Sequence, residues 1–197
     1  KKNPRPCSDR SYFCDTEGVL RRLLGAVVVR SGLRATAEPI EVINDAFDDD
    51  DDHHHHKKTI DDPFSPPRSV VRVFPHMRFL QYSRAGAVLP PHIDLCRVNP
   101  FCPPSDQHNP RYRSTHTFLL YLNDCTAGGE TRLLEEVTAD GSSLALATVS
   151  PRRGRLLVFP HVTPHEGMEV IDVPKILLRG ELQLTNERID RRSPNCC

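Results

Sequence analysis

Short apolar runs punctuated by proline and glycine constrain the fold of this chain most strongly. Four such runs are rich in Leu, Val, Phe and Tyr and are bounded by Gly or Pro: residues 77–82, 117–122, 155–159 and 176–184. Runs of this length and composition predict β-strands. Several short strands separated by turns, with helices confined to the N-terminal side, indicate a mainly β chain that forms a double-sheet roll with flanking helices.

One amphipathic helix is predicted over residues 16–31. Its apolar residues recur at the spacing of a single helical stripe: Val19, Leu20, Leu23, Leu24, Val27 and Val28. Thr16 is the expected N-cap and Gly32 the expected stop. We expect this helix to pack on the outside of the roll.

Two stretches predict loops. Residues 47–58 read FDDDDDHHHHKK, and five aspartates that repel one another cannot enter a core. The proline-rich DDPFSPPR extends this loop to about residue 68, and the histidine tract could hold a metal only loosely. Residues 99–110 form a second irregular stretch.

Charge and hydropathy exclude several classes of protein. The chain has 26 basic and 26 acidic residues, so its net charge gives no reason to expect nucleic acid as a partner. No apolar run reaches the roughly 18 residues of a membrane span. The chain begins without Met or a secretory signal, so we expect a fragment or a processed chain. We expect an intracellular, cytoplasmic location, with the secretory pathway as the open alternative.

Cysteine spacing argues against a zinc ribbon. The seven cysteines are irregularly spaced and contain no Cys-x-x-Cys pair: Cys7, Cys14, Cys96, Cys102, Cys125, Cys196 and Cys197. We expect free thiols in a reducing compartment, and one or two disulfide bridges are the alternative.

Two distant segments supply candidate metal ligands. PPHIDL places His92 and Asp94 two positions apart, and FPHVTPHEG offers His161 and His165. Two imidazoles and one carboxylate leave open coordination positions, which suits non-haem Fe(II). Zinc with two histidines and a carboxylate is a weaker competitor. Spacing alone does not choose between the two downstream histidines.

The last predicted strand carries cations on one face. Alternation puts Ile176, Leu178, Leu182 and Leu184 on an apolar face, and Lys175, Leu177, Arg179, Glu181 and Gln183 on the other. If the second face lines a cavity, its cations need an anionic ligand. Lys175 and Arg179 would lie about 13 Å apart along the strand, so one carboxylate could meet only one of them directly. The alternative is an exposed face on which both cations meet water.

Three ordered blocks carry a family resemblance: RFLQYSRAGAVLPPHID, THTFLLYLNDCTAGGET and SPRRGRLLVFPHVTPHEGMEVIDVPKILLR. The first ends in Pro-His-x-Asp, the second in Gly-Gly-Glu-Thr, and the third has a His-Glu-Gly followed by a lysine ten residues after the histidine. Across residues 77–184 the chain resembles Fe(II)/2-oxoglutarate-dependent dioxygenases of the prolyl 4-hydroxylase-like family. The resemblance implies an oxidoreductase with a double-stranded β-helix, the jelly-roll or cupin-like fold. We therefore expect three parts: an N-terminal helical support with a low-complexity acidic and histidine loop (1–70), which lies outside the resemblance, a dioxygenase catalytic core (71–190) and a tail (191–197).

The resemblance also implies roles for individual residues. His92, Asp94 and His165 correspond to the iron ligands, and Lys175 to the partner of the distal carboxylate of 2-oxoglutarate. Three further residues are implied near the cosubstrate: Tyr82 as a hydrogen-bond donor to the same carboxylate, Arg179 as the reserve for Lys175, and Tyr121 with Thr131 as lining or support. For Tyr121 a packed core position is the alternative.

The implied reaction is hydroxylation with O₂ and 2-oxoglutarate, with L-ascorbate keeping the iron reduced. A prolyl residue of a peptide is the first substrate that the resemblance implies. A free amino acid or other small molecule is the second. Nucleic-acid demethylation is third, because the chain lacks tryptophan and has balanced charge. A non-catalytic binding relative is the remaining alternative, although all three ligands and the lysine are present. The oligomeric state is not predicted.

Overall fold

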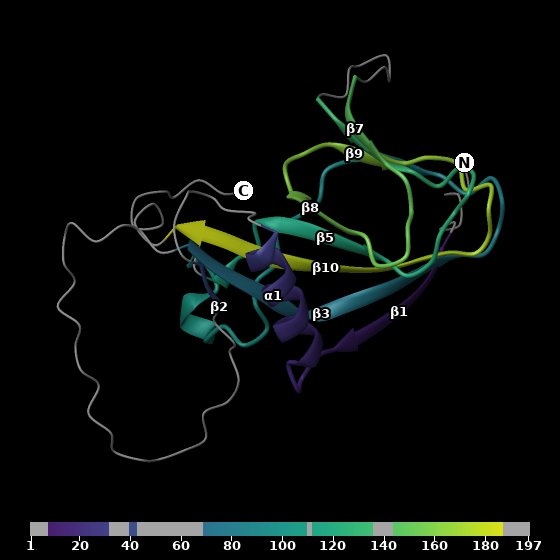
Figure 1. Cartoon of the computed structure of the whole chain (residues 1–197). Helices are drawn as coiled ribbons and strands as arrows, with labels where there is room; N and C mark the ends of the chain where they lie inside the picture. Colours follow the sequence, from purple (N-terminus) through teal and green to yellow (C-terminus); the bar gives the residue numbers. More distant parts are fainter. Residues whose placement is uncertain (1–7, 32–39, 43–68, 110–111, 136–143, 187–197) are drawn as a thin grey trace, which may run out of the picture.

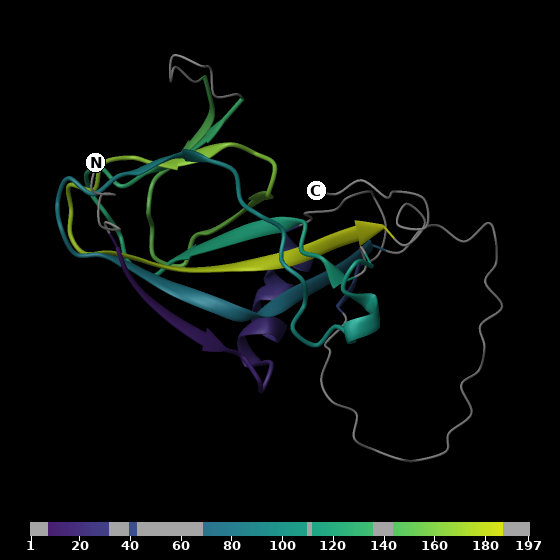
Figure 2. The same cartoon turned by 180° about the vertical axis from the view of Figure 1, so that it is seen from behind.

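Two β-sheets face each other across the centre of the chain (Figures 1 and 2). The computed structural model describes residues 8–31, 40–42, 69–109, 112–135 and 144–186. The predicted loop over 47–68, the stop at Gly32 and the tail over 191–197 lie outside these ranges.

Non-sequential strand order defines the two sheets. The major sheet has the order β1-β3-β10-β5-β8, with β2 beside β3: β1 (Asp9–Cys14), β3 (Ser69–Tyr82), β10 (Lys175–Asn186), β5 (His116–Tyr121), β8 (Leu156–Pro160) and β2 (Ile40–Val42). The minor sheet has the order β4-β9-β6-β7: β4 (Leu89–His92), β9 (His165–Gly167), β6 (Thr131–Leu134) and β7 (Ala145–Val149). Successive strands alternate between sheets from β8 to β10, which makes the chain a double-stranded β-helix, or jelly roll, as predicted.

β3 is longer than the sequence predicts because it runs through a proline. Pro75 lacks a backbone donor and ordinarily ends a strand. Here the register between β3 and β10 shifts, from Gly180 opposite Met77 to Leu182 opposite Val73. Pro75 falls within this irregularity, where no ladder hydrogen bond is needed from its nitrogen.

The predicted helix is confirmed as α1 (Val19–Arg30), although it begins later than expected. Gly18, not Thr16, occupies the N-cap, with a φ of 71°. The Asp15 carboxylate accepts the Arg21 backbone N–H at 2.8 Å and so takes over the capping role. Leu24 and Val28 pack against the outer face of the major sheet (Figure 1).

Alternation along the major sheet separates two cores. The outer face packs under α1 with Val71, Val73, Met77, Phe118, Leu178 and Leu182. The inner face, between the two sheets, carries Leu80, Tyr82, Leu119, Tyr121, Phe159 and Leu177. The side chains of Lys175, Arg179 and Glu181 share this inner face with Leu177, because residues two apart in a strand point the same way.

All four predicted strands are confirmed, within β3, β5, β8 and β10. The short strands β1, β2, β4, β6, β7 and β9 were not predicted. The described part of the irregular stretch 99–110 holds the 3₁₀ turn η1 (Pro104–Asp106). None of the helices in the described ranges has the length and apolarity to cross a bilayer.

The cysteine prediction is wrong at one position. Cys96 is disulfide-bonded, whereas Cys14, Cys102 and Cys125 are free thiols. Spacing along the chain could not reveal this bond, because pairing depends on which residues the fold brings together.

Candidate metal centre

Three residues from two neighbouring strands bring their ligand atoms together. His92 ends β4 and pairs across the minor sheet with His165, the first residue of β9. Asp94 follows β4 and lies beside both. One ligand atom from each of the three side chains lies within 4.8 Å of the other two. Asp94 lies 3.9 Å from Nε2 of His92 and 3.6 Å from Nε2 of His165.

Backbone carbonyls orient both imidazoles. Nδ1 of His92 lies 2.9 Å from the Pro90 carbonyl oxygen, and Nδ1 of His165 lies 3.1 Å from that of Thr163. A carbonyl oxygen only accepts, so each Nδ1 donates the hydrogen bond, and in the neutral tautomer that fits this contact Nε2 is the nitrogen with the lone pair. Burial, with the neighbouring His92, lowers the pKa of His165, which favours its neutral form. Both Nε2 atoms are therefore available as metal ligands.

The Asp94 carboxylate is held from two sides. Its Oδ2 accepts the Thr117 hydroxyl at 2.6 Å, and its Oδ1 accepts a guanidinium N–H of Arg179 at 2.5 Å. Arg179 comes from β10 and Thr117 from β5, both on the inner face of the major sheet. These bonds fix the carboxylate in one orientation.

His161 supports Asp94 and is not among the clustered ligands. Thr117 gives its single proton to Asp94, so its oxygen accepts from Nδ1 of His161 at 2.9 Å. Nε2 of His161 then accepts the Ser114 hydroxyl at 2.7 Å. The His161 carbonyl also accepts the Asp94 backbone N–H at 3.1 Å. Both ring nitrogens of His161 are thus occupied, and burial lowers its pKa.

Sequence reasoning missed this supporting chain. Thr117 stands in the second block of the resemblance but was given no role, Ser114 lies outside the three blocks, and His161 was considered only as a ligand. The one available signal was the alternation in HTFLLY, which places Thr117 on the same face as Leu119 and Tyr121.

Lys175 is a buried cation at the start of β10. It is 2% exposed, so the alternative of an exposed cationic face is wrong. Within the described ranges its ammonium makes no ion pair, although its Nζ lies 5.1 Å from the centre of the Tyr82 ring. Burial lowers the pKa of Lys175 from 10.5 to about 8. Arg179, the predicted reserve, is already paired with Asp94 and Glu181.

Tyr121 both packs in the core and makes a polar contact. It is fully buried, and its hydroxyl donates to Thr131 Oγ1 at 2.7 Å. Tyr121 of β5 pairs with Leu177 of β10, which follows Lys175 on the inner face of that strand. Burial raises the pKa of Tyr121 to about 12, so the phenol stays protonated. Tyr82 and Tyr121 therefore belong to the inner core near Lys175, and Tyr121 connects that core to Thr131 of β6.

Comparison with known families decides the class of protein. The family model described as the 2OG-Fe(II) oxygenase superfamily matches residues 77–180, more than half of the 197-residue chain. This chain belongs to the 2OG-Fe(II) oxygenase superfamily. The match begins in β3 and spans His92, Asp94, His165, Lys175 and Arg179.

The solved structures that resemble this oxygenase share little of its sequence and superpose on it only in part. A Pseudomonas putida prolyl-4-hydroxylase has 25% identity and a TM-score of 0.38, over 56% of this chain and 52% of that one. A prolyl 4-hydroxylase of Phytophthora capsici has 18% identity and a TM-score of 0.37, over 58% and 33%. An RmlC-like cupin of Desulfovibrio desulfuricans has 17% identity and a TM-score of 0.29, over 65% and 95%. The chain thus matches about half of the P. putida enzyme and a third of the P. capsici one. No curated protein matches it.

The residues present fit the groups that the superfamily uses. Two imidazole nitrogens and one carboxylate on one side of a metal suit Fe(II) and leave coordination positions for other ligands. The buried Lys175 ammonium, which makes no ion pair with any described residue, suits the distal carboxylate of 2-oxoglutarate. The Asp94 carboxylate is opposite in charge to Fe(II), and the Lys175 ammonium is opposite in charge to the distal carboxylate of 2-oxoglutarate.

Proposed function

We propose that this oxygenase is an Fe(II)/2-oxoglutarate-dependent dioxygenase that hydroxylates an organic substrate. The observation that carries the proposal is the buried Lys175, which makes no ion pair in the part of the chain that the structure describes. It lies on the same inner face of β10 as Arg179, the residue that holds Asp94. An unpaired ammonium at 2% exposure is unfavourable unless an anion binds there. The site needs a ligand for a metal held near Asp94 and an anion for Lys175. A cosubstrate with a carboxylate at each end supplies both.

The chain's own residues bind, orient and exclude water. His92, Asp94 and His165 would hold the iron, and Lys175 would bind the distal carboxylate of 2-oxoglutarate. When bound, iron and 2-oxoglutarate supply the activation of O₂, with succinate and CO₂ as by-products. Thr117 and Arg179 keep Asp94 in place for this chemistry.

Two contacts involve the side chains around Lys175. The Tyr82 ring lies against the ammonium and stabilises its charge without neutralising it. The bond from Tyr121 to Thr131 satisfies two buried hydroxyls, which would otherwise compete for the cosubstrate or for water.

The proposed substrate is a prolyl residue in a peptide, with L-ascorbate maintaining the iron as Fe(II). Support for this choice comes from the three sequence blocks that resemble prolyl 4-hydroxylases. A free amino acid or another small molecule is the second candidate. It is favoured by a pocket of about 580 Å³ in the described part of the chain, within the roughly 300–1,000 Å³ of small-molecule sites.

Succinate formation tests the chemistry. We expect the full chain, given Fe(II), ascorbate, O₂ and 2-oxoglutarate, to form succinate slowly even without substrate. Asp94→Ala should abolish this activity because it removes one of three ligands. Glu17→Ala, which removes an exposed carboxylate near α1, should leave it unchanged. Undiminished succinate formation by Asp94→Ala would show that the ligand assignment is wrong.

Mass spectrometry of peptides tests the substrate. We expect a peptide library incubated with the same components to gain one oxygen on proline. A gain on other residues, or on free amino acids alone, would replace the prolyl proposal while leaving the oxygenase chemistry in place.

A further inference from the structure

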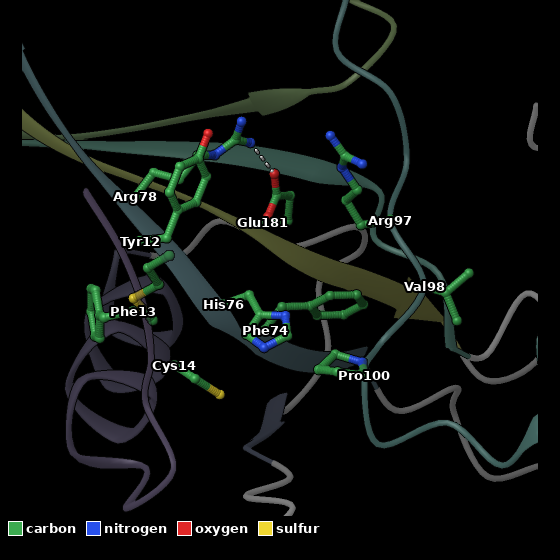
Figure 3. A pocket seen from close by; sticks show the side chains of 11 residues that line it. Tyr12, Phe13, Cys14, Phe74, His76, Arg78, Arg97, Val98, Pro100 and Glu181 are labelled. Atoms are coloured by element: carbon green, nitrogen blue, oxygen red, sulfur yellow. Dashed lines mark hydrogen bonds and ion pairs between the residues drawn. The ribbon is translucent and has the colours of Figure 1, made fainter. Parts of the chain in front are cut away.

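An open pocket is connected to the metal centre through Arg179, which bonds both Asp94 and Glu181, a residue of the pocket lining. Its volume is about 580 Å³, and residues of β1, β3 and β10 and of the segment after β4 line it. Figure 3 shows Glu181 between the side chains of Arg78 and Arg97, with the ring of Tyr12 near Arg78. None of the proposed iron ligands and none of the proposed cosubstrate residues lines this pocket.

The pocket and the metal centre share a wall. Along the inner face of β10 the order is Lys175, Leu177, Arg179 and Glu181, with about 6.6 Å between successive members. Arg179 donates to Asp94 in one direction and to Glu181, at 3.3 Å, in the other. The cosubstrate end therefore lies on one side of Asp94 and the pocket on the other. Arg179 and Glu181 stand between the pocket and Asp94, so a molecule in the pocket would lie across this ion pair from the proposed iron.

The charge around this wall is positive. Glu181 accepts Arg78 at 2.8 Å as well as Arg179, and Asp94 accepts Arg179. Arg97 is the third guanidinium, and in the described part of the chain no hydrogen bond or ion pair involves its side chain. Three guanidiniums thus lie around two carboxylates, and Arg97, whose charge also acts on Glu181, is exposed in the pocket lining.

The rest of the lining mixes apolar and aromatic residues with Cys14 and His76. Phe74 and Met77 are buried at 2% and 1% exposure, and Val98 and Pro100 continue the same surface. Such a surface favours a carbon skeleton, while the guanidinium favours a carboxylate, which it can bind with two parallel hydrogen bonds.

We propose that this pocket binds the substrate of the oxygenase and that Arg97 recognises a carboxylate on that substrate. The proposal rests on the proposed function for the identity of the bound molecule as substrate. The carboxylate could be that of a small free acid or that of an acidic side chain in a peptide. Both present the same group to Arg97, and the experiment separates them.

Binding of matched acid and amide probes to the full chain tests the proposal. Calorimetry would use Mn(II) in place of iron and saturating 2-oxoglutarate, so that the cosubstrate end is filled. The probe pairs are N-acetylproline and its carboxamide, 4-phenylbutyrate and its carboxamide, and the peptides acetyl-Glu-Pro-Gly-amide and acetyl-Gln-Pro-Gly-amide. We expect at least one acid to bind about three- to tenfold more tightly than its amide, because Arg97 is exposed and partly screened. Preference within the first two pairs indicates a small acid, and preference within the peptide pair indicates an acidic side chain.

Variants attribute the preference to Arg97. Arg97→Gln should remove it, Arg97→Lys should keep part of it, and Arg152→Gln, an exposed arginine outside the lining, should not change it. Melting curves of each variant report whether it folds. The proposal is overturned if no acid is preferred over its amide, or if the preference survives in a folded Arg97→Gln protein.

The same titrations distinguish the two levels of inference. Metal-dependent binding of 2-oxoglutarate without any acid preference would reject the pocket assignment and retain the oxygenase. An Arg97-dependent acid preference without 2-oxoglutarate binding would retain a carboxylate site and reject the proposed function.

Discussion

Replacing Lys175 by methionine should stabilise the ligand-free protein and remove cosubstrate binding. Methionine has a similar length and no charge. In the wild-type chain, burial lowers the pKa of Lys175 from 10.5 to about 8. At 1.36 kcal/mol for each pKa unit, keeping this ammonium charged in the folded state costs about 3 kcal/mol. Lys175→Met relieves that cost, so we expect a gain of about 1–3 kcal/mol at pH 7.

The gain should depend on pH in a defined way. Below pH 8 lysine is charged in both the folded and the unfolded chain, and the full cost of burial is present. Between about pH 8 and 10.5 the folded wild-type chain loses the proton and the unfolded chain keeps it, so wild-type stability rises with pH. The advantage of Lys175→Met should therefore shrink over this interval and vanish above it.

Urea unfolding at several pH values measures the stability, and calorimetry with Mn(II) measures 2-oxoglutarate binding. At pH 7 a gain of this size corresponds to a rise in Tm of about 3–10 °C. Binding of 2-oxoglutarate should weaken by at least tenfold, because a charge-assisted contact is lost. Unchanged 2-oxoglutarate affinity, or a stability gain that is the same at pH 7 and pH 11, would refute the reasoning.

Three further changes test the supporting structure. Thr117→Val removes a hydrogen bond to Asp94 with little change in shape, so Mn(II) affinity by calorimetry should fall about 10–100-fold, and an unchanged affinity would contradict the role given to Thr117. Burial lowers the pKa of His116 from 6.5 to about 4, so the folded chain loses stability as the pH falls through that interval. Between neutral pH and pH 4, the free energy of unfolding of His116→Gln should therefore fall by about 1–2 kcal/mol less than that of the wild type, after allowance for partial exposure. In Gly180→Ala the added Cβ would lie 2.5 Å from the Phe118 ring, so urea unfolding should show a loss of about 1–3 kcal/mol, and a loss below 0.5 kcal/mol would mean that the ring moves freely.

Periodicity in the sequence determined the main strands and their faces. The alternation around Leu178 and Leu182 predicted a strand with one apolar face, and the structure buries that face under α1. Local patterns succeed here because side chains in a strand alternate with a period of two, whatever the strand pairs with. Segments of three to five residues, such as β4 and β9, carry too few side chains for that period to be recognised.

The motif residues were predictable because the chemistry restricts them to few residue types. His92, Asp94 and His165 stood out as metal-ligand types, and Lys175 stood out as a cation within an apolar strand. Their spacing in sequence did not decide between His161 and His165. The structure brings His165 opposite His92 and directs both nitrogens of His161 to hydroxyls.

Tertiary structure alone decided what supports the site. The bond from Arg179 to Asp94 joins residues 85 positions apart, and the bond from Thr117 to Asp94 joins residues 23 positions apart. Distant segments also determine three other features: the passage of β3 through Pro75, the disulfide bond at Cys96 and the pocket at Arg97. A sequence pattern reports which face of its own strand a side chain occupies. The partner across the cavity is set by strand order and register, which are properties of the whole fold.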